Sequence, residues 1–160
     1  MSNDAILDRF AARVRLICRQ DRRHRVLWVI GEAQTGKSQL CHKAAQMCGW
    51  KHVNYTLDTG YLDTLSGREQ TYRPKDAIAD IRDWCKGTDT EVLLLDEIEP
   101  LLAIWNQAHR QQFYASISKA ERLACGLVLV NRIVTPSVLE PLLPDSNPNR
   151  IFILSRGIRS

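Results

Sequence analysis

The arrangement of apolar residues predicts five short strands separated by helices. The expected strands cover 26–30, 52–57, 92–95, 126–130 and 151–154. Most of these runs lack the apolar–polar alternation of a strand with one face in water. Strands of this kind, separated by helices, indicate a parallel sheet that is covered on both faces. The expected fold class is therefore α/β, with a five-stranded parallel sheet between two helical layers.

Helices are expected between the strands and at the N-terminus. The first should cover about 3–20, where four apolar side chains share one face. These four are Ile6, Phe10, Val14 and Ile17. Further helices are expected over 38–48, 76–86, 101–123 and 136–143. Gly49 is expected to end the second helix as its C-cap, Asp76 to cap the third, and Gly87 to end it.

The length of 160 residues suits one α/β domain over 1–160, with its core over about 25–155. No apolar run approaches the ~20 residues of a membrane helix, and the N-terminus is polar, so a cytoplasmic location without membrane contact is expected. The five cysteines are widely spread and form no C-x-x-C pair. We expect reduced core thiols, and neither a zinc site nor a disulfide framework.

Positive charge is concentrated near the N-terminus, although the net charge is only +4. The arginines there are Arg9, Arg13, Arg15, Arg19, Arg22, Arg23 and Arg25. Such a stripe can face nucleic acid or an acidic partner, or it can be a solvated helix face. A second candidate for DNA contact lies between the second strand and the next helix, where tyrosines and cations are mixed. Its residues are Tyr61, Arg68, Tyr72, Arg73 and Lys75.

A complete G-x-x-x-x-G-K-[ST] phosphate-binding loop occupies 31–38, directly after the first apolar run. Such a loop directs backbone N–H groups and a helix N-terminus at an anion, so it predicts a nucleotide ligand, ATP with Mg²⁺. Lys37 would reach the β- and γ-phosphates, and the Ser38 hydroxyl would hold Mg²⁺. The expected nucleotide-binding residues are Gly31, Glu32, Ala33, Gln34, Thr35, Gly36, Lys37, Ser38 and Gln39.

The third apolar run ends in two acids, Asp96 and Glu97, which is the pattern of a Walker B motif. Asp96 is expected to hold Mg²⁺ opposite Ser38, and Glu97 to polarise the water that attacks the γ-phosphate. Without the phosphate-binding loop, the same pattern would fit a solvated strand end.

Two further residues are candidates for catalysis. Asn131 directly follows the fourth strand and could orient the attacking water, or it could simply form a turn. Arg122 is expected at the end of the helix before that strand, where it could act in a neighbouring molecule as an arginine finger. The alternative for Arg122 is a cation that stabilises the end of a helix. Arg110 and Arg132 are weaker candidates for the finger.

These elements together resemble the AAA+ branch of P-loop ATPases. The resemblance covers about 25–155 and rests on GEAQTGKS, on VLLLDE, on Asn131 in the sensor-1 position and on Arg122 in the arginine-finger position. It implies a three-layer P-loop NTPase fold and nucleotide-dependent oligomers that act on DNA or protein. Members of that branch carry a helical lid after the fifth strand, and only six residues follow 154 here. We therefore expect no C-terminal lid, and an ATPase activity completed in trans.

The phrases GEAQTGKSQL, LLLDEIEPLL and LVLVNRIVTP are also similar to the small P-loop proteins of BREX phage-defence systems. That resemblance implies a bacterial ATPase that works with other defence proteins on DNA. Two other functions fit the same motifs. One is a small-molecule kinase, and the other is a nucleotide-gated scaffold that hydrolyses little.

Overall fold

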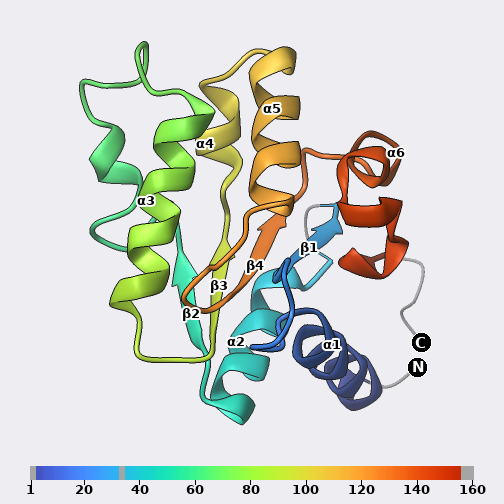
Figure 1. Ribbon diagram of the computed structural model, residues 1–160. Helices are drawn as coiled ribbons and strands as arrows, with labels where there is room; N and C mark the ends of the chain where they lie inside the picture. Colours follow the sequence, from blue (N-terminus) through green and yellow to red (C-terminus); the bar gives the residue numbers. More distant parts are fainter. Residues whose placement is uncertain (1–2, 33–34, 156–160) are drawn as a thin grey trace.

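The computed structural model describes residues 3–32 and 35–155, and it contains one five-stranded sheet in that part of the chain (Figure 1). The strands are β1 (Val26–Gly31), β2 (Lys51–Asn54), β3 (Val92–Asp96), β4 (Gly126–Asn131) and β5 (Ile151–Leu154). They lie in the order β2-β3-β4-β1-β5, and every neighbouring pair is parallel. The expected parallel α/β sheet is confirmed, and the strand order places β4 between β3 and β1.

Helices cover both faces of the sheet (Figure 1). The longer ones are α1 (Asn3–Ile17), α2 (Lys37–Cys48), α3 (Pro74–Gly87) and α5 (Gln107–Ser118). Shorter turns are α4 (Glu99–Ala103), α6 (Pro136–Leu139), η1 (Leu62–Leu65), η2 (Glu140–Leu142), η3 (Pro144–Ser146) and η4 (Pro148–Arg150).

Successive residues of the strands enter two separate cores, as the pleat of a strand requires. In β1, Leu27 and Val29 pack with α1 and α2, whereas Trp28 and Ile30 pack with α3 and α5. Both sets are almost fully buried, which explains why the strands read as uniform apolar runs. The result is a three-layer α/β sandwich, with the parallel sheet between two helical layers.

Some expected boundaries are wrong, and local hydrogen bonds explain why. The second strand ends at Asn54 rather than at 57, because the Asn54 side chain accepts hydrogen bonds from the N–H groups of Thr56 and Leu57 and turns the chain. The first helix ends at Ile17 rather than near residue 20. The third begins at Pro74 rather than at Asp76. Asp76 is its third residue, and the Asp76 carboxylate accepts a hydrogen bond from the Arg73 N–H.

The helix expected over 101–123 is divided. Asn106 caps the start of α5 by accepting a hydrogen bond from the His109 N–H, which separates α5 from α4. Since α5 ends at Ser118, Arg122 is not at a helix end as expected. It stands in the connection to β4 with a positive φ of 60°.

The arginines near the N-terminus do not form one solvated stripe. Arg25 is buried, and its guanidinium donates to the carbonyls of Cys18 and Leu123. Arg13 donates to the carbonyls of Asn149 and Ile151, and Arg15 lies over the Trp50 ring. Several of these arginines therefore attach α1 and the segment after it to the rest of the fold.

The tyrosines proposed for DNA contact also belong largely to the core. Tyr72 is buried and donates its hydroxyl hydrogen to Asp80, and Tyr61 packs against the Trp84 ring. Arg68 lies over the Tyr72 ring. Tyr72 therefore offers no surface on which a base could stack.

All five cysteines are free thiols, as expected, and only Cys48 is partly accessible. Within 3–32 and 35–155, no helix combines the length and apolar character needed to cross a membrane.

Candidate nucleotide-binding site

The carboxyl ends of β1, β3 and β4 meet at one edge of the sheet. Asn131 pairs with Ile30 of β1, so it lies beside the start of the phosphate-binding loop. On the other side of β4 lies the parallel strand β3, which ends at Asp96. The strand order thus inserts Asn131 between the loop and the two acids, where ligands of parallel α/β sheets bind.

Close packing at the first residue of the loop requires a glycine. A Cβ atom on Gly31 would lie 2.8 Å from the Leu154 carbonyl oxygen and 2.8 Å from the Thr35 Oγ1. Gly36 has a φ of 87°, which side-chain-bearing residues rarely adopt, and it precedes α2. Ala33 and Gln34, also expected to bind nucleotide, lie outside the described residues.

The N-terminus of α2 follows this turn without a side-chain cap or an acidic residue in its first turn. Lys37, Ser38 and Gln39 form that turn, and Ser38 and Gln39 are exposed. The first N–H groups of a helix have no partner within the helix and carry its positive dipole. This turn is therefore suited to an anion.

Lys37 folds back over the loop. Its Nζ donates to the carbonyl oxygens of Gly31 at 2.8 Å and Glu32 at 2.7 Å. Partial burial lowers the Lys37 pKa, and the nearby carboxylates of Glu99 and Asp96 oppose that shift. The cation of Arg132 also acts on Lys37, so Arg132 lies near the loop of its own chain.

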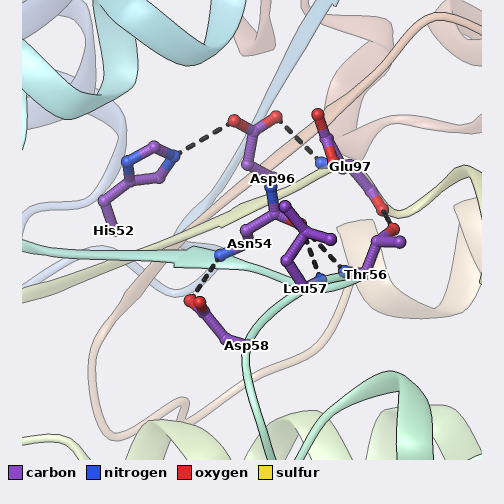
Figure 2. A network of polar contacts seen from close by, with 7 residues as sticks. All are labelled: His52, Asn54, Thr56, Leu57, Asp58, Asp96 and Glu97. Carbon is purple, nitrogen blue, oxygen red and sulfur yellow. Dashed lines mark hydrogen bonds and ion pairs between the residues drawn. The ribbon is translucent and has the colours of Figure 1, made fainter.

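Asp96 is 2% exposed, yet both of its carboxylate oxygens have partners (Figure 2). Oδ1 accepts from the Glu97 N–H at 2.8 Å, and Oδ2 lies 3.1 Å from His52 Nε2. A buried carboxylate needs such partners, because desolvation otherwise favours its neutral form. His52 thus fixes the side chain at the end of β3 from the neighbouring strand β2.

Glu97 has a φ of 55°, in the left-handed region that a residue with a side chain rarely adopts. Its carbonyl accepts a hydrogen bond of 2.9 Å from the Thr56 hydroxyl (Figure 2). The Tyr55 N–H, one residue earlier, donates to the Asp96 carbonyl. The turn after β2 therefore holds the strained turn after β3.

Asn131 is fully buried, and the oxygen and the nitrogen of its side-chain amide have different surroundings. Its Oδ1 accepts from the N–H groups of Ile133 and Val134 and forms the turn after β4. Its Nδ2 is buried without a hydrogen-bond partner among the described residues. An unpaired donor of this kind is rare and unfavourable, and a bound acceptor would satisfy it.

The arginines expected to act in trans have different positions. Arg122 is exposed, and it precedes β4, so it lies at the edge of the sheet opposite the phosphate-binding loop. Arg110 donates its Nε hydrogen to the Leu102 carbonyl. Arg122 is therefore remote from the loop of its own molecule.

The sequence patterns did not single out His52, Thr56 or Glu99. Glu99 accepts from the Arg132 N–H and acts electrostatically on Lys37. Its position two residues after Glu97 could have indicated that it belongs to the site. No spacing along the chain could indicate His52 or Thr56, because their partners are about forty residues away.

The donors at this edge fit a nucleotide with a magnesium ion. Ser38 and Asp96 offer a hydroxyl and a carboxylate, the hard oxygen ligands that Mg²⁺ prefers. Lys37, the open turn of α2 and the unpaired Asn131 Nδ2 are cationic or hydrogen-bond donors and suit phosphate oxygens.

Comparison with known proteins finds similarity in structure only. No protein-family profile and no curated protein matches the sequence. Among solved structures, 227 chains match. One is a Walker-type ATPase of Pyrococcus abyssi, with a TM-score of 0.47 and 12% identity over 96% of this chain. This chain spans 55% of that protein. The match assigns no activity to this chain.

Proposed function

We propose that this protein binds ATP with Mg²⁺ and hydrolyses it. The observation that carries the proposal is that three groups suited to a nucleotide lie together at one edge of the sheet. The uncapped turn of α2 with Lys37, the buried Asp96 and the unpaired Asn131 Nδ2 come together there from three elements. Phosphoryl transfer depends mainly on positioned positive charge and hydrogen-bond donors, which these groups supply.

Each residue has a specific role in this proposal. Lys37 would exchange its loop carbonyls for phosphate oxygens, while Ser38 and Asp96 hold the metal ion that neutralises phosphate charge. Glu97 accepts a proton from water as the water oxygen bonds to the γ-phosphorus and the bond to the β-phosphate oxygen breaks. Asn131 donates its Nδ2 hydrogen to the water or to a γ-phosphate oxygen.

We further propose that a second molecule completes the site. The exposed position of Arg122 at the opposite edge supports this, because Arg122 cannot serve the loop of its own chain. Joining that edge of one molecule to the loop of the next would bring Arg122 to the γ-phosphate. The sequence resemblance to BREX P-loop proteins supports a place for such an assembly beside DNA-linked defence proteins.

Two substitutions test the hydrolytic site. Lys37→Ala should weaken ATP binding at least about 100-fold, because it removes the ammonium from the phosphates. Glu97→Gln should keep the affinity within about threefold and lower single-turnover hydrolysis about 100-fold or more. Lys43→Ala on the exposed side of α2 and Glu91→Gln before β3 are matched controls that should change neither quantity.

These measurements can reject the proposal in two ways. Unchanged affinity in Lys37→Ala would exclude the loop as the ATP site. Full hydrolysis by Glu97→Gln would exclude Glu97 as the base. Light scattering with ATP tests the assembly: Glu97→Gln should retain a larger mass that Arg122→Ala reduces, and a strictly monomeric particle at saturating ATP would contradict it.

A further inference from the structure

A polar cavity lies at the sheet edge opposite the phosphate-binding loop. Its volume is about 560 Å³, and its lining includes Arg22, Arg23, Lys119 and Arg150. These residues come from the segments that precede β1, β4 and β5. Since β1 has six residues at ~3.3 Å each, about 20 Å of sheet separates this cavity from the loop. It is therefore a separate site.

Backbone contacts join the three segments. His24 forms an isolated bridge with Glu121, which joins the entry of β1 to that of β4. Arg150 Nη1 donates to the His24 carbonyl at 2.9 Å, which adds the entry of β5. The cavity is thus built by elements of the core rather than by one surface loop.

Positive charge predominates in the cavity. Glu121 and Asp145 are the carboxylates of its lining, and Glu121 is already paired with Arg23. The Arg23 guanidinium holds the Glu121 pKa below its usual range. Across the part of the chain that the structure describes, no ion pair includes Arg22, Lys119 or Arg150. The cavity therefore has an excess of cations.

Arg150 is the strongest indication of a ligand. It is 8% exposed, and its Nε is buried without a hydrogen-bond partner among the described residues. The Nδ1 atom of His24, which also lines the cavity, is in the same situation. Burial and the neighbouring Arg22 lower the Arg150 pKa, and the Asp145 carboxylate partly opposes this shift. A buried guanidinium is unfavourable unless acceptors of opposite charge surround it.

We propose that this cavity binds a small phosphate-bearing anion, such as pyrophosphate or a free nucleotide. A phosphate group carries negative charge and several acceptor oxygens, which would balance the excess of cations in the cavity, and arginine binds such groups through paired hydrogen bonds. The volume lies in the range of small-molecule sites. Arg150 is so little exposed that only a ligand entering the cavity reaches it, which favours a small anion over a duplex backbone.

The test uses the full chain with Lys37→Ala, which weakens the phosphate-binding loop, and pyrophosphate as the probe. Calorimetry at low salt should still detect one pyrophosphate site. Adding Arg22→Glu should weaken it at least about tenfold, because a repulsive charge replaces an exposed cation of the lining. Adding Lys43→Glu, which replaces an exposed cation on α2 outside the cavity lining, should leave it within about twofold.

Arg22 is exposed, so its replacement should not unfold the protein, and circular dichroism checks this. Lack of pyrophosphate binding in the Lys37→Ala protein would overturn the proposal. Binding that Arg22→Glu leaves unchanged would also overturn it, as would binding of duplex DNA without any binding of pyrophosphate or ATP. These results do not depend on hydrolysis, so they are distinct from failure of the proposed ATPase.

Discussion

At the scale of single residues, the candidate site depends on a strained glutamate and on the side chain that holds it. Glu97 has a left-handed backbone that is unfavourable by about 1 kcal/mol or more for a residue with a side chain. The Thr56 hydroxyl donates to its carbonyl from the neighbouring turn. Thr56 therefore positions the proposed base without touching the substrate.

Replacing this hydroxyl should impair hydrolysis more than binding. We expect Thr56→Val to slow single-turnover ATP hydrolysis about tenfold, because loss of one hydrogen bond frees the turn that bears Glu97. ATP affinity should stay within about twofold, and Thr56→Ser should behave like the unmodified protein because it retains the donor. An equal loss of affinity and rate in Thr56→Val would indicate a general structural defect instead.

At the scale of elements, the helical layer formed by α1 approaches the sheet closely at one glycine. A Cβ atom on Gly126, the first residue of β4, would lie 2.3 Å from the Cβ of Cys18, just after α1. No side-chain movement can relieve this contact, because Cβ atoms are fixed by the backbone. The end of α1 and the start of β4 can therefore meet only where one residue lacks a side chain.

Gly126→Ala should lower the free energy of unfolding by about 3 kcal/mol through overpacking. Gly87→Ala is the matched control: nothing lies within 4 Å of its added Cβ, and it should be neutral or slightly stabilising. Urea unfolding measures both. Cys18→Gly combined with Gly126→Ala should be more stable than Gly126→Ala alone, and lack of any such recovery would show that another contact causes the loss.

At the scale of the whole molecule, both cores bury groups that ionise only at high pH. Burial raises the pKa of the Cys18 thiol from 9.0 to about 12, and it also raises the pKa of Cys41, Tyr55 and Tyr72. The folded protein keeps these groups neutral while the unfolded chain loses their protons. Their stabilising effect is therefore complete below about pH 9 and is lost as the pH rises toward the folded-state values.

The free energy of unfolding should fall as the pH is raised above about 9. Cys18 alone should account for about 1 kcal/mol between about pH 9 and pH 10, by the linkage of its raised pKa. Urea unfolding at these values, with reductant present, measures the change. Cys18→Ala should show a smaller fall, and an identical fall in that variant would exclude Cys18 as a contributor.

The agreement between sequence and structure depends on how far apart the interacting residues lie. The C-cap at Gly49 and the five buried strands follow from neighbouring residues, and they were predicted correctly apart from the end of β2. The expectations for Tyr72, Arg25 and the helix around Arg122 failed, because distant partners or a cap bury or interrupt these segments. A tyrosine between cations looks the same in a sequence whether it is exposed or covered.

The sequence by itself determined the α/β class, the loop with Lys37 and Ser38, and the acids Asp96 and Glu97, because periodicity and local turn chemistry encode them. Only the tertiary structure decided that β4 lies between β1 and β3, that His52 and Thr56 hold those acids, and that Arg150 lines a cavity at the opposite sheet edge. These depend on strand order and crossover connections, which bring together residues from distant parts of the chain.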